Sequence, residues 1–81
     1  MFYFYILYSL KDGKMYYGFS SDLRARFKDH LGGNVDSTKY RRPLRLVYYE
    51  AYEKEEHARL RERQVKESGR LRKELKERLQ L

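Results

Sequence analysis

The sequence predicts an α+β fold, a small three-stranded antiparallel sheet flanked by helices in the order β-β-α-β-α-α. Its apolar runs are short, and they alternate along the chain between β-favouring and helix-periodic stretches, a pattern typical of a small sheet that carries helices. The chain has 81 residues and no cysteine. One domain over residues 1–81 must therefore fold around a single core, without disulfides or a structural zinc site.

The first two strands are predicted as a β-hairpin. The segment Phe2–Tyr8 is aromatic or β-favouring throughout, so we expect a strand that is covered on both faces. The segment Lys11–Lys14 supplies a turn in which Gly13 can take a positive φ. The segment Lys14–Phe19 then returns as the partner strand.

A helix is predicted after the hairpin. Ser20 or Ser21 can cap its N-terminus, with Asp22 in the first turn, and Gly32-Gly33 ends it. The expected buried stripe consists of residues that recur every four positions: Leu23, Phe27 and Leu31.

The second half of the chain predicts a loop, a third strand and two more helices. Residues 33–43 form a polar, basic loop that Pro43 closes, and residues 44–49 form the strand. Residues 53–66 are helical, Ser68-Gly69 interrupts the pattern, and a last amphipathic helix runs to the end. Its apolar stripe is Leu71, Leu75 and Leu79.

The charge distribution favours a polyanionic partner. The formal net charge is +7, and basic segments flank an acidic stretch at residues 50–58, which suits nucleic acid held around a metal site. A solvated, highly charged surface is the plainer alternative. The apolar segment Phe2–Leu10 is too short to cross a bilayer and lacks the features of a signal peptide. We therefore expect a cytoplasmic protein with no membrane association.

Four motifs in order resemble those of the GIY-YIG nuclease superfamily. The first, Tyr3-Phe4-Tyr5 running into Ile6-Leu7, is similar to the "YIL" branch of that family, and the second is Tyr16-Tyr17-Gly18. The segment Asp22–His30 resembles the family's D-L-x-x-R-x-x-x-H helix, and Ala58–Lys66 resembles its A-x-x-R-E-x-x-x-K helix. Between them, Thr38-Lys39 and Arg41–Glu50 are similar to its basic loop and third strand. The match covers residues 3–66.

The resemblance implies a metal-dependent endonuclease that hydrolyses phosphodiester bonds in DNA rather than RNA, for example in DNA repair or recombination. Tyr16 would act as the general base, directly or through a water, and Tyr5 would orient the water or a phosphate oxygen. Arg26 would bind two oxygens of the phosphate. Glu62 would hold one divalent ion, Mg²⁺ or Mn²⁺, since Mg²⁺ needs only one or two carboxylates beside the substrate. Residues of the loop would contact phosphates: Lys39, Arg41 and Arg42.

Each candidate residue also has a structural interpretation. Tyr5 and Tyr16 could be ordinary sheet tyrosines, Arg26 an ordinary surface arginine, and Glu62 the exposed partner of Lys66 one helical turn away. His30 lies one turn after Arg26. It could position Tyr16, transfer a proton near neutral pH, or simply end its helix.

Two other functional classes remain open from sequence. The first is a non-catalytic nucleic-acid-binding protein on the same scaffold, and the second is a protein-interaction module that uses the Leu71–Leu75–Leu79 stripe. We expect a monomer or a weak homodimer.

Overall fold

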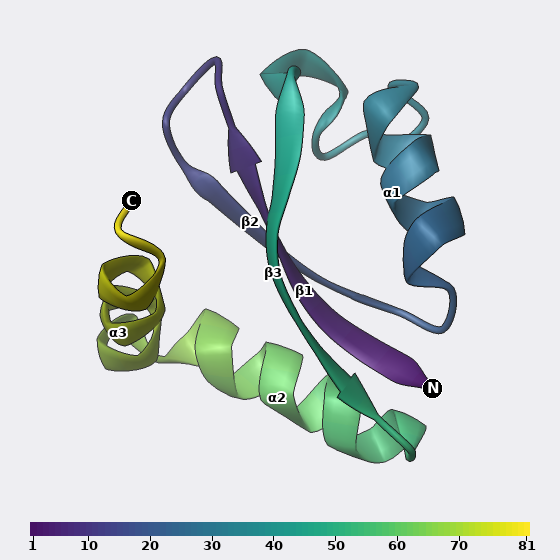
Figure 1. The fold of residues 1–81 in the computed structure, drawn as a ribbon, viewed down its shortest axis with the longest axis vertical. Coiled ribbons are helices and arrows are strands. Elements are labelled where there is room, and N and C mark those ends of the chain that lie inside the picture. The colour runs from purple at the N-terminus through teal and green to yellow at the C-terminus, as the bar shows by residue number, and fades with distance from the viewer.

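The computed structural model describes all 81 residues and confirms the predicted fold class (Figure 1). Its elements, in order, are β1 (Phe2–Ser9), β2 (Met15–Ser20), α1 (Leu23–Leu31), a short 3-10 helix (Lys39–Arg41), β3 (Leu44–Tyr52), α2 (Glu55–Glu67) and α3 (Gly69–Leu79). None of the helices has both the length and the apolar composition that crossing a bilayer requires.

The strand β1 lies at the centre of the sheet, whose order is β2-β1-β3 with both pairs antiparallel. Side chains alternate between the faces of a strand, and both faces of β1 are covered. Its four middle residues, Phe4, Tyr5, Ile6 and Leu7, are therefore all buried. The hairpin turn also forms as predicted, with Gly13 at a φ of 69°.

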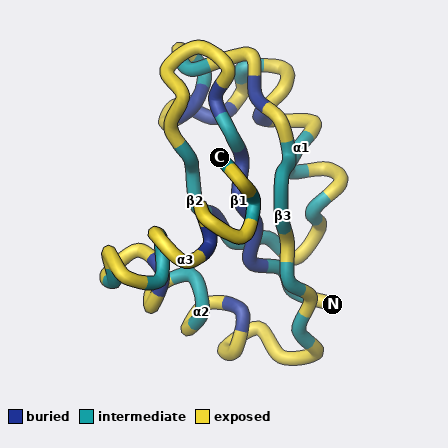
Figure 2. The backbone as a smooth tube through the Cα atoms, turned by 60° about the vertical axis from the view of Figure 1, so that its left-hand side comes forward, coloured by how far each residue is buried: buried dark blue, intermediate teal, exposed yellow.

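Helices cover both faces of the sheet. The helix α1 lies over one face, while α2 and α3 lie over the other (Figure 1). On the α2 and α3 face the core consists of Phe4, Ile6, Val65 and Leu75. On the α1 face it consists of Tyr5, Leu7 and Leu44. The buried part of the trace accordingly follows β1 between the helices (Figure 2).

Two details of α1 differ from the prediction. Asp22, and not Ser20 or Ser21, is the N-cap, and its carboxylate accepts a hydrogen bond from the backbone N–H of Ala25. Leu31 is 49% exposed, whereas His30 is fully buried. In a helix of 3.6 residues per turn, a residue seven positions after Leu23 returns almost to the same face, while one eight positions after it lies about 80° away. The core position therefore belongs to His30.

The C-terminal helices pack as part of the same core. The α2 helix begins at Glu55, two residues after the predicted start, and Ser68 caps α3 by accepting from the N–H of Leu71. Leu75 is 3% exposed and lies in the core, and Leu79 packs against that core. Two of the three leucines of the stripe, Leu75 and Leu79, thus pack inside the molecule, and Leu71 is half-buried. That this stripe binds another protein stays a prediction.

The strand β3 is longer than predicted. It continues past Tyr49 to Tyr52 because β1 remains its partner over that length, with Phe2 paired to Tyr52. The register shifts between Ile6 and Leu7, which leaves Val47 as an extra residue in a β-bulge.

Candidate active site

The two hairpin tyrosines meet on the α1 face of the sheet. Tyr5 pairs with Gly18, and Tyr16 pairs with Leu7, two residues further along β1, so both side chains emerge on the same face. Their ring centroids are 6.4 Å apart. A Cβ atom at Gly18 would stand 2.4 Å from Cζ of Tyr5. The glycine of the second motif therefore leaves the space that the Tyr5 ring occupies.

His30 joins the two tyrosines from α1. Its Nε2 lies 2.8 Å from the Tyr5 hydroxyl, and its Nδ1 lies 2.7 Å from Oγ1 of Thr38. The Thr38 hydroxyl in turn donates to the carbonyl of Val35 at 3.5 Å. Thr38 therefore accepts from the Nδ1–H of His30, and Nε2 accepts from Tyr5. The Tyr16 ring lies edge-on to the imidazole, with centroids 5.2 Å apart.

Burial keeps both partners of the Tyr5–His30 hydrogen bond neutral. Burial, followed by the charge of Arg26, lowers the pKa of His30 from its usual 6.5 to about 4. Burial also raises the pKa of Tyr5 to about 12, although the nearby Arg26 opposes this change. At neutral pH His30 is thus a neutral hydrogen-bonding group that holds the Tyr5 hydroxyl. Its role in the reaction stays a prediction.

Arg26 places a positive charge beside Tyr5. It lies one turn before His30 on α1, and contact with the Tyr5 hydroxyl raises the pKa of Arg26. No carboxylate forms a salt bridge with it, and its side chain is half-buried at the edge of the cluster. A guanidinium in this position can bind two oxygens of a phosphate.

Glu62 approaches the cluster from α2. Its charge is one of the factors that raise the pKa of Tyr5, so the carboxylate lies within electrostatic range of the hydroxyl. The side chain is 22% exposed and forms a salt bridge of 3.2 Å with Nζ of Lys66. The chain contains no group of three or more potential metal-ligating side chains. A single carboxylate fits an ion such as Mg²⁺, which keeps most of its waters and takes other oxygens from a substrate phosphate.

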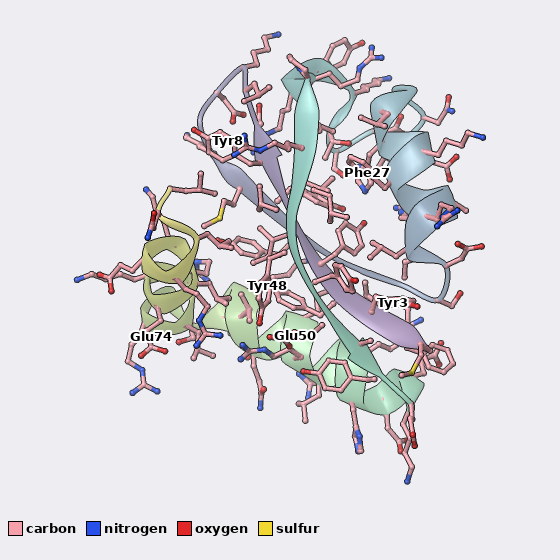
Figure 3. The ribbon with its side chains drawn as sticks, viewed as in Figure 1. Tyr3, Tyr8, Phe27, Tyr48, Glu50 and Glu74 are labelled. Atoms are coloured by element: carbon pink, nitrogen blue, oxygen red, sulfur yellow. The ribbon has the colours of Figure 1, made fainter.

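The residue before Glu62 anchors α2 to the sheet. Nε and Nη2 of Arg61 donate to the Glu50 carboxylate at 3.0 and 3.1 Å, and the hydroxyls of Tyr48 and Tyr52 donate to the same carboxylate at 2.7 and 2.6 Å. Tyr48 and Glu50 lie between β3 and α2 (Figure 3). Burial alone would raise the pKa of Glu50, but these hydrogen bonds lower it below its ordinary value. The anchor fixes the rotation of α2, and so the direction of Glu62.

Comparison with known proteins identifies the family. The model of the GIY-YIG catalytic domain matches residues 1–76. A UPF0213 protein of Staphylococcus aureus (strain Mu50) is 39% identical over 64 residues, which make up 78% of each chain. The solution structure of the UPF0213 protein BH0048 from Bacillus halodurans is also 39% identical, with a TM-score of 0.57 over 93% of this chain and 81% of that one.

The chain belongs to the GIY-YIG family. The GIY-YIG domain implies an endonuclease superfamily, suggests that the partner is nucleic acid, and is generally associated with divalent metals. In this GIY-YIG chain the structure gathers four of the predicted site residues in direct contact, Tyr5, Tyr16, Arg26 and His30. It places the fifth, Glu62, within electrostatic range of them.

The basic loop of this GIY-YIG domain is tied to the protein itself. Nε of Arg41 lies 2.7 Å from a carboxylate oxygen of Asp12, and Nε of Arg42 donates to the carbonyl of Lys39. Nζ of Lys39 lies 3.5 Å from Asp36. The charge of Arg41 is thus largely neutralised, and its main structural effect is to join the loop to the hairpin turn. That these loop residues bind nucleic acid stays a prediction.

Two residues of the cluster had no role predicted from sequence. Thr38 completes the hydrogen-bond chain through His30, and the hydroxyl of Ser37 donates to that of Tyr16 at 3.4 Å. The signal that could have indicated Thr38 was the similarity of Thr38-Lys39 to the family's loop motif. Ser37 carries no such signal, because its contact depends on how the loop folds back over β2.

Proposed function

We propose that this chain is a metal-dependent endonuclease that hydrolyses phosphodiester bonds in DNA. The observation that supports the proposal is the cluster itself: two tyrosines, a neutral histidine and an arginine without a salt bridge, with a carboxylate within electrostatic range of Tyr5. The groups come from four elements of the chain: β1, β2, α1, which supplies both Arg26 and His30, and α2. A role in DNA repair or recombination is part of the proposal and rests on the resemblance of the chain to the nucleases of those processes.

Tyr16 and Tyr5 would act on the attacking water. Tyr16 is the more exposed of the two. In its deprotonated, phenolate form it would accept the proton of the water, directly or through a second water, and become the neutral phenol. Tyr5 donates its own proton to His30 and accepts from Arg26, so the remaining lone pair of its oxygen would orient that water. The water oxygen bonds to phosphorus as the bond from phosphorus to the 3′ oxygen breaks.

Arg26 and Glu62 would act on the phosphate. The Arg26 guanidinium would bind the non-bridging oxygens, whose negative charge grows in the transition state. Glu62 would hold one Mg²⁺ or Mn²⁺ ion, which when bound polarises the phosphate and assists the departing 3′ oxygen. Lys66 would have to leave Glu62 for this carboxylate to hold an ion, since the two cations would compete for one carboxylate.

The test is cleavage of plasmid DNA, branched DNA and RNA with Mg²⁺ or Mn²⁺ by matched pairs of variants. We expect Arg26→Ala to lower the rate by about 100-fold or more and Arg24→Ala, an exposed arginine on the same helix, to leave it nearly unchanged. Glu62→Gln should abolish metal-dependent cleavage, whereas Glu67→Gln on the same helix should not. Equal rates within each pair would refute the proposed site.

The second candidate function is that of a non-catalytic nucleic-acid-binding protein. The salt bridge between Lys66 and Glu62 favours it, because Glu62 is the only proposed metal ligand and its carboxylate is already paired with a cation. In this case the affinity for DNA should survive Glu62→Ala, or improve as repulsion falls, and should decrease with salt. Metal-dependent nicking by the wild type, lost in Glu62→Gln, would exclude it.

A further inference from the structure

A basic hollow lies on the sheet face opposite the candidate active site. It has a volume of about 270 Å³ and is formed by the β1–β2 hairpin and α3. Its lining includes four cationic side chains and two tyrosines: Lys14, Arg72, Lys73, Lys76, Tyr8 and Tyr17. These residues come from three elements and the turn between two of them, so no single helix face accounts for the cluster.

The four cations of this hollow form no salt bridge within the chain. None of its four cations has a carboxylate oxygen within 4.0 Å. The nearby Asp12 is paired with Arg41 instead, and Glu74 lies on the outer side of α3 (Figure 3). The guanidinium of Arg72 is held by the carbonyls of Val65 and Lys66. One cation of the cluster is therefore fixed in place before any ligand binds.

Both tyrosines leave a hydroxyl without a partner in the protein. Neither the Tyr8 nor the Tyr17 hydroxyl makes an intramolecular hydrogen bond, unlike those of Tyr5, Tyr48 and Tyr52. The Tyr8 hydroxyl would lie 3.7 Å from a Cβ at Gly13, so it reaches the hairpin turn. Arg45 lies over the Tyr8 ring, 5.7 Å from its centroid, and adds a further positive charge. Free hydroxyls beside unpaired cations are suited to the oxygens of a phosphate diester.

We infer that this hollow binds the phosphodiester backbone of a single-stranded segment of the nucleic-acid substrate. The candidate active site lies under α1, whereas this hollow lies beside α3 on the other face (Figure 1). Duplex DNA is stiff over about 150 base pairs, so a straight duplex at the active site cannot also enter the hollow. A flexible single strand can pass around the hairpin tip, and cations beside aromatic side chains are the usual features of single-strand binding.

The inference rests on the proposed nucleic-acid substrate but not on cleavage, and binding is therefore measured with EDTA present. Fluorescence anisotropy would follow the wild type, Lys73→Gln/Lys76→Gln and the control Arg70→Gln/Arg78→Gln. The control also removes two positive charges from α3, but at positions that do not line the hollow. The probes are a blunt DNA duplex and the same duplex with a single-stranded tail.

We expect the Lys73→Gln/Lys76→Gln variant to lose affinity for the tailed duplex and to change little with the blunt one. The slope of log affinity against log salt should fall in magnitude by about 1.4 for the tailed duplex, since each single-strand phosphate contact contributes about 0.7. The control should keep the wild-type slope. Equal losses in the two variants, equal losses with the two probes, or no loss at all would each overturn the inference.

A second measurement does not depend on variants and separates two sources of phosphate. In NMR titrations of the wild-type protein, the Tyr8 and Tyr17 ring signals and the Gly13 amide should shift with the tailed duplex at lower concentration than with inorganic phosphate or a mononucleotide. If the mononucleotide saturates these signals as readily, the hollow is a free-nucleotide site and the inference is wrong. Unchanged signals with every probe would also overturn it.

Discussion

Replacing Gly18 by alanine tests the closest approach in the candidate active site. The added Cβ would stand 2.4 Å from Cζ, 2.5 Å from Oη and 2.8 Å from Cε1 of Tyr5. Carbon atoms in ordinary contact are about 3.5–4.0 Å apart, so the ring must retreat by about 1 Å. Tyr5 is 1% exposed and packs with Leu7 and Leu44, which leaves it little room.

The expected cost follows from these contacts. Overpacking a well-packed core destabilises a protein by about 1–3 kcal/mol. A shift of about 1 Å would also stretch the 2.8 Å bond between Tyr5 and His30 beyond hydrogen-bonding range, which adds about 1 kcal/mol. We therefore expect Gly18→Ala to lower the free energy of unfolding by about 2–4 kcal/mol.

The assay is unfolding in guanidinium chloride, followed by circular dichroism. With a slope of about 2 kcal/mol per molar for a chain of this size, the midpoint should fall by about 1–2 M. The control is Gly69→Ala at the start of α3, where the nearest atom to an added Cβ, Nη2 of Arg72, is 3.7 Å away. It should be neutral or stabilising by up to about 1 kcal/mol. Equal midpoints for Gly18→Ala and the wild type would show that the Tyr5 ring does not lie against Gly18.

Three further predictions concern stability. His30 has a pKa of about 4 in the folded chain and about 6.5 when unfolded, so the unfolded state takes up the proton first as the pH falls. About 3 kcal/mol of stability should therefore be lost between pH 6.5 and pH 4. Denaturation of His30→Gln across this range should show a smaller loss, and a loss equal to that of the wild type would contradict the lowered pKa of His30. Glu50→Gln should lower the free energy of unfolding by about 1–3 kcal/mol in the same denaturation assay, because it leaves the half-buried Arg61 without its anionic partner. An unchanged free energy of unfolding would mean that the pair does not anchor α2. Leu75 is 3% exposed, so Leu75→Ala should lower the free energy of unfolding by about 2–5 kcal/mol. The same change at Leu60, which is 40% exposed, should have a small effect. Similar thermal midpoints for the two variants would place Leu75 outside the core.

The parts of the fold that depend on local pattern could be predicted from the sequence. The hairpin follows from two β-favouring runs around a turn with Gly13, and the burial of both faces of β1 follows from its unbroken run of aromatic and aliphatic residues. The boundaries were less accurate. The cap of α1 is Asp22 because its carboxylate is the side chain that reaches the N–H of Ala25, and neighbouring residues of similar capping tendency could not be separated without that geometry.

The composition of the candidate site could be predicted only in part. The motifs indicated Tyr5, Tyr16, Arg26, His30 and Glu62, but they did not indicate which partner each one has. His30 does lie against the Tyr16 ring, but its hydrogen bonds to Tyr5 and Thr38 were not indicated. Arg41 was grouped with the phosphate-binding residues, and its pairing with Asp12, 29 residues away in the chain, was not indicated. Such pairings depend on loop conformation, and loop conformation is set by contacts between remote segments.

By itself, the sequence determined the order of strands and helices, the basic charge and the motifs of the GIY-YIG family, since each of these depends on residues close together in the chain. Only the tertiary structure decided which charges are free and which are paired. It neutralised Arg41, left Arg26 beside a buried phenol, and formed a basic hollow between α3 and the hairpin turn. The physical reason is that electrostatic interactions depend on distance and burial in space, and a linear sequence specifies neither directly.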